Sequence, residues 1–124
     1  RSSRSRNACS GRYFARMGKM PGEAQAGVYS GALHYLKAVK AVNSKDPEKV
    51  VAMMREMPVE DAFARRGRLL PNGRMVHDML LVEVKAPSQS KQAWDYYKIL
   101  ATIPAEKAFR PLSESACPLT KKKS

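Results

Sequence analysis

The sequence has no long apolar run, few cysteines and no acidic residue near its start. No apolar stretch approaches the roughly 20 residues that a helix needs to cross a bilayer. The sequence also has no charged start followed by an apolar region, which is the pattern of a signal peptide. Two cysteines, Cys9 and Cys117, cannot build the disulfide framework of a small secreted domain, although a single bridge between them stays open. These absences exclude a membrane-spanning segment and a cysteine-stapled scaffold.

The net charge of +12 is concentrated at the two ends of the chain. Residues 1–20 contain six Lys or Arg and no acid, and residues 121–123 are three lysines, so the ends supply nine of the twelve charges. Residues 21–120 carry 14 basic and 11 acidic side chains, a balance that is ordinary for a solvated globular surface. The middle of the chain therefore predicts no basic patch for a polyanionic partner.

The chain divides into three parts by composition. Residues 1–11, RSSRSRNACSG, hold little that could be buried, which predicts a disordered basic tail. Residues 12–120 hold the apolar pattern of one domain, and residues 121–124 form a second basic tail. Within the domain, residues 12–18 predict a short helix that ends at Gly18.

Two further helices are indicated by apolar spacing and by capping residues. Over 23–42 the apolar residues recur with a helical period; they are Val28, Ala32, Leu36 and Val39, with Tyr29 and Leu33 widening the stripe. The triplet Asp46-Pro47-Glu48 supplies an N-cap, a proline for the first helical position and an acid for the first turn. A helix should therefore run from Pro47 to about Met57, before Pro58.

The second half of the chain predicts strands. Short apolar runs at 67–70, 76–84 and 94–103 are separated by a Pro71–Arg74 turn, in which Asn-Gly supplies positive φ angles, and by a polar loop. Prolines then punctuate an extended tail. The expected fold class is α/β, with helices followed by a short antiparallel strand meander whose open edges suggest part of a larger domain.

Catalytic and metal-binding patterns are missing from the sequence. The histidines and cysteines do not fall at zinc-ligand spacings, and no serine or cysteine nucleophile motif or glycine-rich phosphate loop occurs. Glu60 and Asp61, the one adjacent acidic pair, follow a helix-ending proline and are interpreted as a solvated turn. We therefore expect neither an enzyme nor a cofactor or metal.

Two functional hypotheses from the residues themselves stay open at this point. Arginines in the 65–74 segment could contact phosphates, and aromatics at 94–97 could stack on bases, as in a small basic nucleic-acid-binding module. Aromatic residues in a predicted strand more often fill a core, so nucleic-acid binding is a weaker hypothesis for them than a packing role. The other alternative is a translated but nonfunctional truncated remnant.

From Gln25 to Leu119 the chain resembles the C-terminal segment of the leucine/isoleucine/valine-binding superfamily of periplasmic solute-binding proteins. The resemblance is carried in the family's order by the blocks AQAGVYSGALHYLKAV, KVVAMMREMPVEDAFARRGRL, NGRMVHDMLLVEVKAPSQSK, AWDYYKILATIPAEKAFRPL and CPL. Residues 1–11 do not match it. In the complete type I fold of this family, two α/β lobes close on a solute. The resemblance implies that this chain forms part of that fold and is therefore a fragment of a binding protein of an ABC importer.

The resemblance also implies a site, partners and a location. The start of the long helix is expected to approach the cleft, so Gln25 and Tyr29 are the candidate ligand-binding residues; alternatively, Gln25 caps the helix and Tyr29 packs. The implied partners are an amino acid or related amide and the ABC permease subunits in the periplasm, with no nucleic acid. Because most of the cleft would come from segments not in this sequence, we expect the chain alone to bind solutes feebly.

Overall fold

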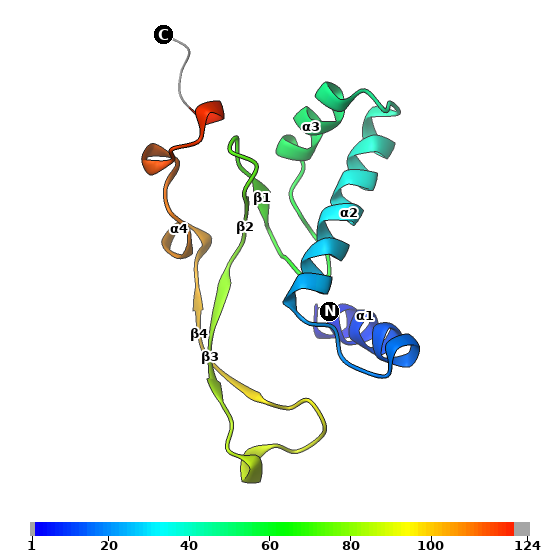
Figure 1. The fold of residues 1–124 in the computed structure, drawn as a ribbon, viewed down its shortest axis with the longest axis vertical. Coiled ribbons are helices and arrows are strands. Elements are labelled where there is room, and N and C mark those ends of the chain that lie inside the picture. The colour runs from blue at the N-terminus through cyan, green and yellow to red at the C-terminus, as the bar shows by residue number, and fades with distance from the viewer. Residues whose placement is uncertain (1, 121–124) are drawn as a thin grey trace.

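The computed structural model describes residues 2–120, which form helices followed by two small antiparallel sheets (Figure 1). Three helices come first: α1 (Ser2–Met17), α2 (Glu23–Val42) and α3 (Pro47–Glu56). The strands are β1 (Arg68–Leu69), β2 (Met75–Val76), β3 (Met79–Val84) and β4 (Tyr97–Ile103). The short helix α4 (Ala105–Ala108) and 3-10 turns at Pro87–Gln89, Leu112–Glu114 and Pro118–Thr120 complete the fold. The expected order of helices before antiparallel strands is confirmed.

Helix α1 begins at Ser2, so residues 2–11 are helical and the prediction that they form a disordered tail is wrong. The segment has no proline, and a polar composition does not by itself prevent a helix. The helix ends as expected at Gly18, whose φ of 67° is left-handed and whose N–H bonds the Phe14 carbonyl. Arg1 and the predicted basic tail 121–124 lie outside the described residues.

Helix α2 has the predicted bounds but buries a different face from the predicted one. The residues buried along it are Ser30, His34 and Ala38, whereas Val28 and Leu36 of the apolar stripe are exposed. Ser30 and His34 can be buried because both find hydrogen-bond partners in the chain that packs on this face. The apolar stripe therefore lies on the surface of the described residues.

Helix α3 begins and ends close to where the sequence predicts. Asp46 caps it by accepting hydrogen bonds from the N–H groups of Glu48 and Lys49, and Pro47 occupies the first helical position. Helix α3 packs on α2 through the buried Val50, and the His34 ring nitrogen Nε2 lies 2.8 Å from the Met54 carbonyl oxygen. The two helices thus form the first layer of the core.

The segment between α3 and β1 runs back along α2 toward its N-terminal end (Figure 1). Lys37 of α2 donates a hydrogen bond to the Glu60 carbonyl, and Val59 pairs with Gly67 in an isolated antiparallel bridge. The buried apolar core lies here; its members are Ala38, Val50, Val59, Ala64 and Val76. Helix α3 and this returning segment, and not a sheet, cover the buried face of α2.

The described strands form two separate two-stranded sheets, β1–β2 and β3–β4, so the single three-strand meander is corrected. The predicted 76–84 strand is interrupted at His77-Asp78, where an Asp78 carboxylate oxygen accepts the Ala105 N–H from outside the ladder. The predicted 94–103 strand begins only at Tyr97, because Trp94 adopts a left-handed φ of 70°. Each departure lies at a residue that stands outside the strands.

The turn between β1 and β2 also differs from the predicted one. Gly73 takes a positive φ of 79°, whereas Asn72 does not. Leu70 donates a hydrogen bond to the Arg74 carbonyl and Gly73 donates one to the Leu70 carbonyl, which closes a three-residue loop. The hairpin therefore has a three-residue loop whose last residue, Gly73, is left-handed. The expected two-residue Asn-Gly turn, with both residues at positive φ, is not formed.

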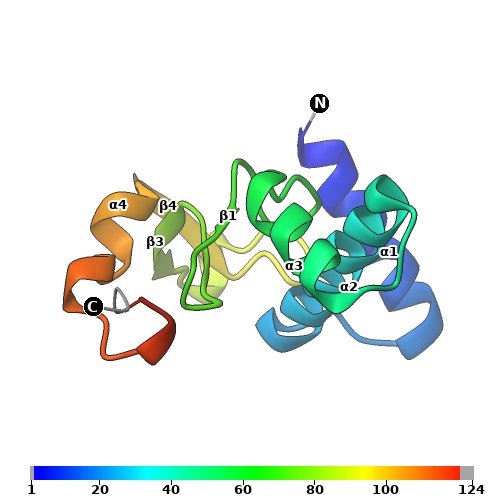
Figure 2. The same cartoon turned by 90° about the horizontal axis from the view of Figure 1, so that it is seen from above.

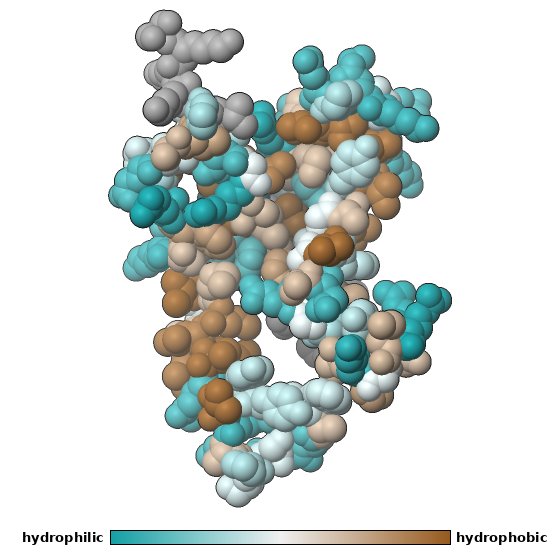
Figure 3. Space-filling model, in the orientation of Figure 1, coloured by the Kyte–Doolittle hydropathy of each residue, from teal (hydrophilic) through white to brown (hydrophobic). Residues whose placement is uncertain are grey.

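The β3–β4 ribbon exposes apolar side chains on both faces. Its register pairs Met79 with Ile103 and Val84 with Tyr97, with an irregularity between Leu81 and Val82. Figure 3 shows the ribbon as a hydrophobic area, and Figure 2 places it between helices α1–α3 and the α4 end of the chain. A two-stranded ribbon buries too little apolar surface to be stable by itself. Its exposed apolar faces are therefore typical of a ribbon that packs against other protein structure.

Candidate functional site

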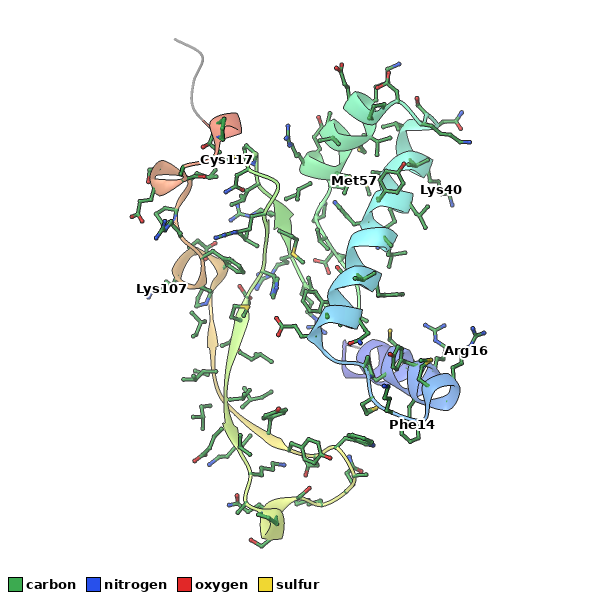
Figure 4. The ribbon with its side chains drawn as sticks, viewed as in Figure 1. Phe14, Arg16, Lys40, Met57, Lys107 and Cys117 are labelled. Carbon is green, nitrogen blue, oxygen red and sulfur yellow. The ribbon has the colours of Figure 1, made fainter. Side chains whose placement is uncertain are left out.

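A pocket of about 270 Å³ lies between α1 and the N-terminal part of α2. Its lining comes from α1, from the linker between the two helices, from α2 and from the segment before β1; the residues are Cys9, Ser10, Tyr13, Pro21, Gln25, Ala26, Tyr29, Ala62 and Phe63. Figure 4 places Phe14 and Arg16 on α1 beside the N-terminal end of α2, with Lys40 at the opposite end. The pocket therefore brings together both residues predicted from the sequence, Gln25 and Tyr29.

Gln25 and Tyr29 lie one helical turn apart and share a face of α2. The Gln25 side-chain oxygen Oε1 accepts the Gly22 N–H at 3.0 Å, so Gln25 caps the helix while it lines the pocket. Its amide nitrogen Nε2 is left as a donor. Tyr29 is 40% exposed, so its ring forms a wall of the pocket and is not enclosed in the core.

Helix α1 supplies the opposite wall through Cys9, Ser10 and Tyr13. The sequence reasoning missed Cys9 and Ser10 because it assigned residues 1–11 to a tail. The four-residue spacing of Cys9 and Tyr13, which places both on one helix face, is the signal that could have found them. In the structure Cys9 and Cys117 are free thiols.

The third wall, at Ala62 and Phe63, is held in place by Asp61. One Asp61 oxygen accepts the N–H groups of Phe63 and Ala64, at 2.7 and 2.8 Å. The other accepts the hydroxyl of Ser30, a buried residue of α2, at 2.6 Å. The interpretation of Glu60-Asp61 as a solvated turn is therefore wrong for Asp61, which is half-buried and joins the wall to α2.

The orientation of the Phe63 ring is set by a neighbouring histidine. The rings of Phe63 and His77 meet edge to face, with centroids 5.1 Å apart, and His77 makes a similar contact with Phe109. Edge-to-face pairs are a favoured arrangement of aromatic rings. The third wall is thus fixed both by its backbone and by its side chain.

The chemistry of the pocket is that of binding and not of reaction. Among its lining residues in the described chain, none carries a charged side chain, and the polar groups are an amide, hydroxyls and a thiol. Residues 2–120 contain no group of three His, Cys, Asp or Glu side chains placed to hold a metal ion. The arrangement offers apolar contact and a few hydrogen bonds, which suits an uncharged part of a small molecule.

The loop between β3 and β4 packs against α1, near the pocket. The Lys85 ammonium lies 2.6 Å from an Asp95 carboxylate oxygen, and the Lys91 N–H bonds the other oxygen. These two contacts, Lys85 first, hold the pKa of Asp95 below its ordinary value of 3.8. The next residue along the chain, Trp94, meets Phe14 of α1 edge to face at 6.2 Å. This aromatic pair brings the loop into contact with α1.

No helix within residues 2–120 has the length and apolar character needed to span a membrane.

Comparison with known proteins gives the chain a family. The model of the periplasmic binding protein family matches residues 2–92, which includes the residues 2–11 that the resemblance had left unmatched. A comparison with curated proteins gave no match.

Two solved structures are similar to the chain over most of its length. A branched chain amino acid ABC transporter periplasmic ligand-binding protein from Burkholderia xenovorans LB400 is 53% identical, with a TM-score of 0.87, over 93% of this chain and 31% of that chain. A periplasmic binding protein from Burkholderia mallei is 49% identical, also with a TM-score of 0.87, over 93% of this chain and 30% of that chain. The chain thus spans less than a third of either structure, and it belongs to the periplasmic binding protein family, with a partial type I fold.

Proposed function

We propose that this chain is part of the substrate-binding component of an ABC importer for amino acids or related amides, with no catalytic role. Membership of the periplasmic binding protein family supports a binding role. The similar Burkholderia xenovorans protein is a ligand-binding protein of a branched chain amino acid transporter, which supports the solute class. The absence of charged groups from the pocket lining agrees with binding as opposed to acid–base chemistry.

The proposal extends to domain, partners and location. Residues 12–120 are the C-terminal portion of a solute-binding domain. Because the family match begins at residue 2, it supports extending this portion to include the whole of α1. The partners are the small solute and the ABC permease subunits. The location is the periplasm, because the similar proteins are periplasmic binding proteins.

The observation that carries this proposal is the joint placement of Gln25 and Tyr29 in a pocket between α1 and α2. The two helices are joined by a short linker that contains Gly18 and Pro21. A change in the angle between them would open or narrow the pocket, and a solute bound to both walls would favour the narrow state.

The nucleic-acid alternative gains little support from the described residues. Arg66 and Arg68 each lie within 4.0 Å of a carboxylate, that of Asp78 or Glu106, which partly neutralises them. The aromatic residues Trp94, Tyr96 and Tyr97 meet one another edge to face, so part of each ring is already in contact with a neighbour. The remaining alternative is a nonfunctional remnant, which predicts broad, non-cooperative thermal unfolding. A folded domain predicts a cooperative unfolding transition.

The proposal is tested by a chimera with the Burkholderia xenovorans relative. This chain replaces the segment of the relative that it matches, and leucine, isoleucine and valine are titrated by calorimetry into the chimera and the parent. We expect the chimera to bind at least one of the solutes that the parent binds. Gln25→Ala and Tyr29→Ala should weaken that binding by about tenfold, the effect of roughly 1.4 kcal/mol.

The matched control is Tyr35→Ala, on the same helix but outside the pocket. It should leave the affinity unchanged. A chimera that melts cooperatively but binds none of the parent's solutes would contradict the proposal.

A further inference from the structure

We infer that the pocket between α1 and α2 receives an aromatic side chain of the solute, in preference to a branched aliphatic or a charged one. The inference rests on the proposed function, because it assumes that the pocket is the solute site. It goes further in naming the class of side chain that is bound.

The three rings that line the pocket come from three separate parts of the chain. Tyr13 belongs to α1, Tyr29 to α2 and Phe63 to the segment before β1. Aromatic rings attract one another in offset or edge-to-face arrangements, beyond the area that they bury. A ring bound in the pocket is bordered by aromatic side chains from three parts of the chain, and an aliphatic side chain gains no ring–ring attraction from them.

The size of the pocket agrees with such a guest. The remaining apolar lining residues, Pro21, Ala26 and Ala62, are small and leave space between the rings. The pocket volume is about 270 Å³, and a cavity of roughly 150 Å³ is enough to hold benzene. A phenyl or phenol group therefore fits with room for the atoms that connect it to the rest of the solute.

The polarity of the lining disfavours a charged side chain. Because none of the lining residues is charged, a carboxylate or ammonium group in the pocket would lose its hydration without gaining an ionic partner. The Gln25 oxygen Oε1 already accepts the Gly22 N–H, so its Nε2 is the group that can donate to a carbonyl or carboxylate oxygen of the solute. This arrangement accepts a polar main-chain group at Gln25 and an aromatic group among the rings.

The ring of Phe63 is held ready for this contact before a solute binds. Its N–H is bonded to Asp61, and its ring meets His77 edge to face. A wall that needs no rearrangement loses little conformational entropy on binding. Tyr29, in contrast, is 40% exposed, so its ring can be replaced without opening the core.

The test is a set of ¹H–¹⁵N NMR titrations of the full chain with phenylalanine, leucine and glutamate. We expect phenylalanine to bind about tenfold more tightly than leucine and glutamate to bind most weakly, with the shifts centred on Tyr13, Gln25 and Tyr29. Tyr29→Leu should reduce the preference for phenylalanine over leucine to about one- to threefold. The matched variant Tyr35→Leu, on α2 but outside the pocket, should retain the full preference.

The outcomes separate this inference from the proposed function. Leucine binding as tightly as phenylalanine, or glutamate more tightly than either, would overturn the aromatic preference and leave amino-acid binding intact. Shifts centred on the exposed β3–β4 ribbon would overturn the pocket as the site. The absence of binding by all three solutes would overturn the inference for this chain, while the chimera would still report on the proposed function.

Discussion

The hydroxyl of Ser30 lies 2.6 Å from a carboxylate oxygen of Asp61, which is 31 residues further along the chain. Ser30 is on the buried face of α2, and Asp61 also holds the backbone of Phe63 and Ala64. One hydrogen bond therefore connects two of the three walls of the pocket. The binding surface depends on this buried polar contact as much as on the residues that line it.

Removing either side of this contact should destabilise the chain by different amounts. Ser30→Ala should cost about 1–2 kcal/mol of unfolding free energy, because Asp61 keeps its two backbone N–H partners. Asp61→Ala should cost about 3 kcal/mol, because it leaves the Ser30 hydroxyl and two N–H groups without their acceptor. Urea unfolding followed by far-UV circular dichroism measures both.

Ser113→Ala, at an exposed position, is the control for the loss of a hydroxyl and should change stability little. Equal costs for Ser30→Ala and Ser113→Ala would contradict the role of the Ser30–Asp61 contact.

Gly67 should not tolerate a side chain, whereas a glycine of α2 should. A Cβ atom at Gly67 would lie 3.0 Å from the Cβ of Val59 and 3.2 Å from the sulfur of Met75, both of which would have to shift. Gly67→Ala should therefore destabilise the chain by about 1–3 kcal/mol. Gly31→Ala, which meets nothing within 4 Å, should stabilise it by about 0.5–1 kcal/mol through helix propensity.

Thermal unfolding of the two alanine variants checks this pair directly. A rise of the melting temperature in both variants would show that the packing around Gly67 is looser than the structure indicates, and a fall in both would contradict the gain predicted for Gly31→Ala.

The Lys85–Asp95 ion pair should make the β3–β4 loop sensitive to acid. The folded-state pKa of Asp95 lies below its ordinary value of 3.8, mainly because of the hydrogen bond from Lys85. A lowered folded-state pKa adds stability that is present above pH 3.8 and is lost as the pH falls through the folded-state value. Carbon-detected NMR titration of the Asp95 carboxyl should give a pKa below 3.8.

In Lys85→Met the pKa of Asp95 should rise toward 3.8. Lys98→Met removes the exposed partner of Glu83, 3.9 Å away, and should leave the pKa of Asp95 where it was. A pKa of Asp95 at or above 3.8 in the unmodified chain would contradict the prediction.

Two valine positions should separate the core from the exposed ribbon. Val50 is 1% exposed between α2 and α3, and Val50→Ala should cost about 2 kcal/mol for the lost methyl groups and the cavity. Val84, on the ribbon, is 72% exposed, and Val84→Ala should change stability by less than about 0.5 kcal/mol. Urea midpoints of the two variants, measured at the same chain concentration, provide the comparison.

A comparable loss from Val84→Ala would mean that the ribbon is covered in solution. Sedimentation at several concentrations would then show whether a second copy of the chain covers it.

The local elements of this protein follow from its sequence alone. The Asp46-Pro47-Glu48 triplet predicts the start of α3 because a cap and a fixed proline φ act within one helical turn. The bounds of α2 follow from the helical period of its apolar residues, and the same spacing places Gln25 and Tyr29 on one face. The family resemblance of the sequence also indicates the type of binding fold.

The tertiary structure decided which surfaces are buried and which residues meet. The apolar stripe of α2 predicted the wrong buried face, because Ser30 and His34 find partners in Asp61 and the Met54 carbonyl, and no local pattern records a partner 20 or 31 residues away. The break in the predicted 76–84 strand also lies where a distant contact is made, since Asp78 accepts the Ala105 N–H, 27 residues further along the chain. Spacing along a chain determines elements through interactions within a few residues, whereas a pocket needs walls that only folding brings together.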